Sequence, residues 1–140
     1  MALIEPDENG NYPFVDLIEV EMFGVQIPLF TNYATMIETI SAISDIPTDS
    51  EPYAFNGMVV HGSTEAGTPV TALYLHPNSS ADVWVHEASH LVDFVIFSLG
   101  LDETIHGTET RAYMLQHFFR EITAIMSSYQ TDVDFEGSVH

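Results

Sequence analysis

The chain of 140 residues contains no cysteine and no lysine, and its only arginines are Arg111 and Arg120. The lack of cysteine excludes disulfide frameworks, thiol nucleophiles and every zinc site built on thiolates. Against the two arginines stand 21 acidic residues, which gives a formal net charge of −19. Such a surface repels phosphate groups, so the composition argues against nucleic acid and against anionic membranes as partners.

Long apolar runs are also missing. The most apolar stretch, residues 91–101, is interrupted by Asp93 and falls well short of the roughly 20 residues that span a bilayer. The first residues, MALIEPDENG, show neither a positive segment nor an apolar core of the kind that marks a secretory signal. We therefore expect no membrane-spanning segment and no signal peptide.

The length and an apolar content of 46% predict a single domain over residues 1–140 with a real core. Residues 1–13 are interpreted as a loose arm, and 130–140 as a frayed acidic tail. Alternation predicts an apolar strand face of Ile18, Val20 and Met22. Strands are expected within 14–31, on either side of a turn at Gly24, and a helix follows over 33–44, capped by Asn32 or Thr31. Two further strands are expected over 54–61 and 70–76. A second helix starts at a Ser79–Asp82 capping motif and ends at Gly100, and a third runs over 109–129, capped by Thr108. This order predicts an α+β fold.

The segment His86-Glu87-Ala88-Ser89-His90 carries the chemistry. Histidines four residues apart on a helix share one face, so both imidazoles can reach one metal ion. Glu87 points toward the side where a metal-activated water would lie. This is the HExxH pattern of zinc hydrolases, with two ligands and a general base. Its apolar flanks strengthen the interpretation, because polar groups in a buried helix are costly unless a metal compensates them.

Zinc needs a third protein ligand and an open position. We rank Glu109 first, because a following helix packed antiparallel on the first would return its carboxylate to the metal. Asp93 comes second, since it lies one turn beyond His90, where an acid more often supports an imidazole. His106, in the connecting loop, comes third. The spacing expected for a metzincin is absent, because Asp93 and Ile96 occupy its glycine and histidine positions.

The two-helix segment HEASHLVDFVIFSLGL and ETRAYMLQHFF resembles small zinc metallopeptidases encoded by tailed phages and related viruses, which follow the gluzincin plan. The resemblance covers about residues 79–120. It implies a minimal zincin-like domain, in which a small antiparallel or mixed sheet packs on an active-site helix and a following C-terminal helix. It also implies that His86, His90 and Glu109 bind Zn²⁺ and that Glu87 is the catalytic base.

In such a site zinc would lower the pKa of a bound water toward about 7, and Glu87 would accept its proton. Tyr113, one turn after Glu109, is a second catalytic candidate that would polarise a carbonyl, and the alternative is an ordinary core role. His117 lies a further turn on, where a structural role is favoured. The strand over 71–76 is expected to offer an edge to an extended peptide. In so small a domain the cleft would be shallow, or completed by a partner chain or a viral assembly.

Two functional hypotheses follow from these residues. One is a peptidase that acts on peptide or protein substrates. The other is a non-catalytic structural or assembly protein, such as a virion or tail component of a haloarchaeal or other tailed virus, that retains the fold and the metal. Because a charge of −19 is tolerated best where salt screens it, we expect a halophilic setting, either in the cytoplasm of a host or in a virion.

Overall fold

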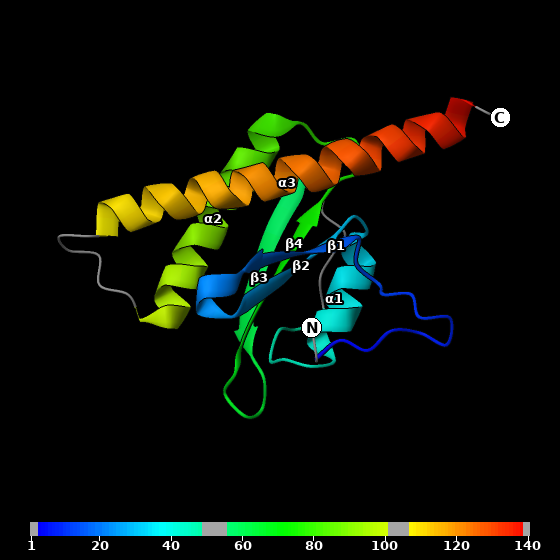
Figure 1. The fold of residues 1–140 in the computed structure, drawn as a ribbon. Helices are drawn as coiled ribbons and strands as arrows, with labels where there is room; N and C mark the ends of the chain where they lie inside the picture. Colours follow the sequence, from blue (N-terminus) through cyan, green and yellow to red (C-terminus); the bar gives the residue numbers. More distant parts are fainter. Residues whose placement is uncertain (1–2, 49–55, 101–106, 139–140) are drawn as a thin grey trace.

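A computed structural model of the chain describes residues 3–48, 56–100 and 107–138. The fold is α+β, and the order of its main elements is the predicted one (Figure 1). The elements are β1 (Asp16–Val20), a 3₁₀ turn η1 (Glu21–Phe23), β2 (Val25–Phe30), α1 (Tyr33–Ser41), β3 (Gly57–Ser63), β4 (Pro69–Leu75), α2 (Ala81–Leu99) and α3 (Gly107–Ser138).

The four strands form one mixed sheet in the order β1-β2-β4-β3. The pairs β1/β2 and β3/β4 are antiparallel, whereas β2 and β4 run parallel. The strand predicted to offer a free edge, β4, is therefore internal, and that prediction is wrong. The chain passes through α1 after β2 and returns so that Leu29 and Phe30 of β2 lie beside Leu73 and Tyr74 of β4. The edge strand next to β4 is β3.

Each face of the sheet carries its own hydrophobic cluster. On one face Leu73 and Leu75 of β4 pack against α2 and α3. On the other face Ala72 and Tyr74 of the same strand pack against α1. This alternation buries β4 on both faces, as its near-continuous apolar sequence requires. Helix α3 crosses over α2 at a steep angle instead of running antiparallel to it, contrary to our expectation (Figure 1).

Several local predictions are confirmed. The side chain of Asn32 caps α1 by accepting a hydrogen bond of 2.9 Å from the backbone N–H of Thr35. Gly100 ends α2 with a φ of 64°, a left-handed conformation that a residue with a Cβ adopts at a cost. The β3–β4 hairpin closes through a hydrogen bond from Thr64 N–H to the carbonyl of Thr68 as well as through the strand register.

Other local predictions are wrong. Met22 is 81% exposed, because η1 interrupts the strand alternation before Gly24. Helix α3 continues to Ser138, so the tail is helical from 130 to 138 and is not frayed there. Helix α1 ends at Ser41, which leaves Ala42 exposed. The arm is not wholly loose, since Ile4 is buried in the α1 cluster. Residues 54 and 55 of the predicted third strand lie outside the described residues.

Within the described residues, none of the helices combines the length and hydropathy needed to cross a membrane.

Candidate metal and catalytic site on helix α2

The two histidines of the HExxH segment converge on one point outside α2. Both are exposed, their rings lie with centroids 4.9 Å apart, and their Nε2 atoms are 3.3 Å apart. Two nitrogens that bind one tetrahedral zinc at about 2.0–2.1 Å each lie about 3.3 Å apart. The distance between the two Nε2 atoms therefore equals the distance that a shared zinc ion would require. In the absence of metal, one imidazole can donate an N–H to the other at this distance.

Glu87 lies on the adjacent flank of α2 and is only 6% exposed. Its Oε1 is 4.0 Å from His86 Nε2, so the carboxylate borders the histidine pair. Burial raises the pKa of Glu87, while the nearby His86 and His90 act in the opposite direction. A carboxylate with a raised pKa is a better proton acceptor, which is the property that a general base needs.

The position of Glu87 depends on a close approach between α2 and the edge strand. A Cβ added at Gly57 of β3 would lie 2.8 Å from Glu87 Cγ and 3.1 Å from Val83 Cγ1, so only glycine fits there without displacement. Gly57 was not among the predicted site residues. The available signal was an isolated glycine inside the predicted strand 54–61, which often marks a close approach of another backbone or a ligand.

Side-chain hydrogen bonds between residues close in sequence hold the first turn of α2. Ser80 is the N-cap, and its hydroxyl donates to Asp82 and not to the backbone. This bond lowers the pKa of Asp82. Ser79, which the capping motif placed at this position, instead accepts a hydrogen bond of 3.0 Å from Trp84 Nε1. The predicted Ser79 cap is therefore wrong by one residue, and Ser79 anchors the buried indole.

Helix α3 adds a second anchor to the same segment. The side-chain amide of Gln130 donates to the carbonyls of Pro77, at 3.0 Å, and Ser79, at 2.8 Å. These bonds join the far part of α3 to the residues that precede α2. The backbone direction at the start of the HExxH helix is thus set by a residue about fifty positions later in the chain.

The predicted third ligands lie apart from the histidine pair or outside the described residues. Asp93 forms an ion pair with Arg111 of α3. Glu109 is exposed at the start of α3 and borders a pocket between α3 and the β1–η1 segment. His106 lies outside the described residues. Over the described ranges, no group of three His, Asp or Glu side chains is close enough to hold a metal ion. The structure thus unites His86, His90 and Glu87, and it leaves Glu109 elsewhere.

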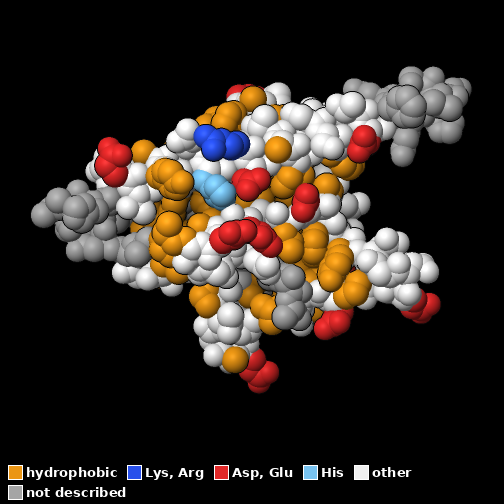
Figure 2. Space-filling model, in the orientation of Figure 1, with side chains coloured by type: hydrophobic (Ala, Val, Ile, Leu, Met, Phe, Trp, Pro, Cys, Tyr) orange, Lys and Arg blue, Asp and Glu red, His pale blue; other side chains and the backbone are white. Residues whose placement is uncertain are grey.

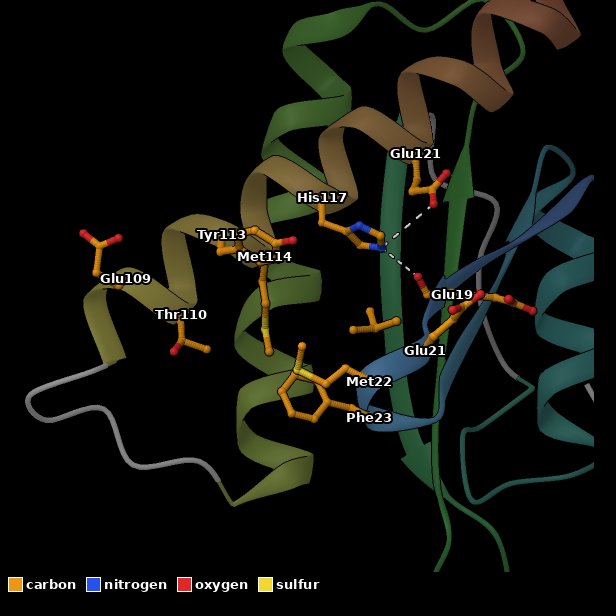
Figure 3. A pocket seen from close by; sticks show the side chains of 11 residues that line it. Glu19, Glu21, Met22, Phe23, Glu109, Thr110, Tyr113, Met114, His117 and Glu121 are labelled. Carbon is orange, nitrogen blue, oxygen red and sulfur yellow. Dashed lines mark hydrogen bonds and ion pairs between the residues drawn. The ribbon is translucent and has the colours of Figure 1, made fainter.

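Tyr113 and His117 also lie away from this pair and line the pocket that Glu109 borders (Figure 3). His117 Nε2 donates a hydrogen bond of 2.7 Å to the backbone carbonyl of Glu19, and it lies 4.0 Å from Glu121 Oε1. Its imidazole therefore joins α3 to β1, which agrees with the structural role that we favoured. The Tyr113 side chain is 70% exposed.

His61 is a further histidine near α2, and its contacts are structural. Its Nδ1 lies 2.8 Å from Thr71 Oγ1, and its ring stacks on Phe94 with centroids 4.8 Å apart. Burial lowers its pKa, against the raising effect of Asp45. These contacts occupy the imidazole and give it a structural role between β3, β4 and α2.

Comparison with models of protein families, with curated proteins and with solved structures finds no match for this chain.

Proposed function

We propose that the protein is a zinc-dependent peptidase whose metal is held by His86 and His90 and whose base is Glu87. The observation that carries the proposal is the 3.3 Å separation of the two Nε2 atoms beside a nearly buried carboxylate. Burying a carboxylate costs free energy unless a positive charge compensates it. A divalent ion at the histidine pair would supply that charge next to Glu87.

The third ligand in this proposal is Glu109, as the sequence resemblance implies. In the structure Glu109 borders the pocket beside β1 and η1, so its binding to zinc requires the first turn of α3 to approach the histidine pair. Asp93 is the less suitable candidate, because Arg111 already neutralises its charge. Residues 101–106, which precede α3, lie outside the described residues.

In the proposed hydrolysis of a peptide bond, the zinc ion and Glu87 have separate roles. When bound, zinc would polarise the scissile carbonyl and activate a water molecule. Glu87 accepts a proton from that water and then delivers it to the leaving amine. The raised pKa of Glu87 favours the first transfer, because the carboxylate holds the proton more strongly than an exposed glutamate would.

The edge of β3 is the segment best placed to hold an extended substrate. The bonded partners Asn56/His76 and Thr64/Thr68 show that even-numbered residues of β3 bond to β4. The backbone groups of Gly57, Val59 and His61 therefore point away from β4, since bonded and non-bonded pairs alternate in an antiparallel ladder. Among the described residues no strand pairs with this edge, which begins where Gly57 touches Glu87. A peptide added there would pass beside the base.

A peptide-library cleavage assay tests this function directly. Wild-type protein saturated with zinc should cleave some sequences, and His86→Ala should cleave none. The matched control is His117→Ala, which removes a histidine that bonds to the Glu19 carbonyl and leaves the proposed ligands in place. Activity that survives in His86→Ala would overturn the proposal. Failure of the wild type to cleave at any salt concentration, with zinc bound, would favour the alternative of a structural or assembly protein that retains the metal.

A further inference from the structure

The surface between α3 and the β1–η1 segment contains a groove that the proposed peptidase chemistry does not use. Its volume is about 600 Å³. Met22 and Phe23 of η1 and Met114 of α3 extend toward one another across it, as Figure 3 shows. Two of the most exposed large hydrophobic side chains among the described residues, Met22 and Tyr113, lie on this groove.

The groove is bordered by acidic side chains. Glu109 lies at one end, and Glu19, Glu21 and Glu121 lie toward the other (Figure 3). The lining residues include no lysine or arginine, and Arg120, which directly precedes Glu121, is not among them. In Figure 2 hydrophobic side chains lie among acidic ones on the face shown, and an arginine side chain lies beside a histidine there. The groove thus combines an apolar floor with a negative border.

Exposed methionines suit such a surface, because their flexible side chains adapt to different apolar partners. Here Met22 is held at the tip of a short turn that Gly24 closes with a φ of 64°. The opposite wall is fixed by the hydrogen bond from His117 to the Glu19 carbonyl. One wall is therefore anchored to the sheet, while the Met22 side chain is largely exposed.

We infer that this groove binds a basic segment of another protein, which inserts an aliphatic or aromatic side chain between flanking lysine or arginine residues. Charge complementarity selects this occupant. A second copy of the chain is disfavoured, because it also carries a net charge of −19 and would bring further carboxylates to the groove. An uncharged apolar molecule would fill the apolar floor but would make no use of the acidic border.

The test measures binding of three labelled peptides by fluorescence anisotropy. The first peptide alternates leucine and lysine, the second replaces leucine by serine, and the third replaces lysine by glutamate. The experiment uses the full chain at about 0.1 M salt, where the Debye length is about 10 Å and distant charges are screened. A chelator is present, so that cleavage cannot remove the peptide, and the result does not depend on the proposed peptidase activity.

Met22→Ser is the decisive variant, and Phe97→Ser is its matched control. Phe97 is 78% exposed on α2 and does not line the groove, so both changes remove one exposed hydrophobic side chain at constant charge. The leucine–lysine peptide should bind at least about tenfold more weakly to Met22→Ser and unchanged to Phe97→Ser. Because Met22 is exposed, folding of the variant should be preserved, and circular dichroism checks this.

The acidic border is tested with a matched pair of double variants. Glu21→Gln with Glu121→Gln removes two charges at the groove, and Glu5→Gln with Glu65→Gln removes two exposed charges elsewhere. Only the first pair should weaken binding. Equal losses in both pairs, or equal binding of the leucine–lysine and serine–lysine peptides, would overturn the inference in favour of non-specific charge attraction. Binding of the leucine–glutamate peptide, or self-association that Met22→Ser abolishes, would overturn the choice of a basic partner.

Discussion

The outer face of α2 and the groove beside α3 both contain histidines and glutamates, yet their contacts differ. On α2, His86 and His90 bond to each other, and Glu87 is nearly buried beside them. In the groove, His117 bonds to a backbone carbonyl, and Glu121 is half exposed. A histidine that donates a hydrogen bond to a backbone carbonyl joins two elements of the fold. Two exposed histidines whose Nε2 atoms converge can instead bind a ligand. The difference lies in what surrounds the side chains and not in their chemical type.

The largest expected effect separates the two kinds of histidine. Purified protein should bind about one zinc ion, and His86→Ala or His90→Ala should abolish that binding. His117→Ala should leave zinc binding intact and cost about 1 kcal/mol in the free energy of unfolding, because the Glu19 carbonyl loses its hydrogen bond. Metal analysis and denaturant unfolding measure the two effects. Full zinc occupancy in a variant lacking both His86 and His90 would remove the site assignment.

The second prediction compares two glutamates under the same substitution. Glu87→Gln should retain zinc and lose turnover by about 10²- to 10⁴-fold, because an amide cannot accept the proton. Glu121→Gln should change turnover little. Loss of zinc from Glu87→Gln would instead indicate that Glu87 has a structural role at the metal.

The same Glu87→Gln variant predicts a pH effect on the metal-free protein. Since burial raises the folded-state pKa of Glu87, its ionisation destabilises the fold. The penalty is absent below the unfolded pKa of about 4.3 and grows as the pH rises through the folded pKa. Glu87→Gln should therefore melt at a higher temperature than wild type at pH 7, and this difference should close in acid. A difference that is independent of pH would contradict the burial argument.

The third prediction concerns α3, which carries Glu109, the proposed third ligand of zinc. Glu109→Ala should weaken zinc binding by more than about 100-fold if α3 delivers the third ligand, which exceeds the usual effect of a supporting residue. Asp93→Asn should have a much smaller effect, because its carboxylate pairs with Arg111 and not with an imidazole. Isothermal titration with zinc measures both. An unchanged affinity in Glu109→Ala would leave Glu109 only at the border of the groove and would undo the gluzincin resemblance.

The smallest effects per residue should come from salt, spread over the whole surface. Charge repulsion should favour unfolding at low ionic strength, so the melting temperature at pH 7, with zinc saturated, should rise from about 0.01 M to about 1 M potassium chloride as the Debye length falls from about 30 Å to about 3 Å. Salt should weaken peptide binding at the groove over the same range. A flat melting curve would mean that bound cations or a partner already neutralise the acids, and the halophilic expectation would be wrong.

Much of the local structure could be predicted from the sequence. The alternation in residues 14–31, the glycines at 24 and 100 and the cap at Asn32 act over a few residues, so each gives the same result in any fold that accepts them. The HExxH spacing likewise determines that His86 and His90 share one face of α2, because four residues make about one helical turn. These signals are short in range and independent of packing.

The tertiary structure decided how these pieces meet. The edge position of β3, the exposure of Met22 and the steep crossing of α3 over α2 depend on which elements pack together, and sequence periodicity carries no information on that choice. The crossing of α3 places Glu109, Tyr113 and His117 beside β1 and η1 and not at the histidine pair. The sequence alone determined which residues face the same way along one helix. Only packing decided which helix faces lie opposite one another, because contacts between distant segments form through the burial of their combined apolar surface.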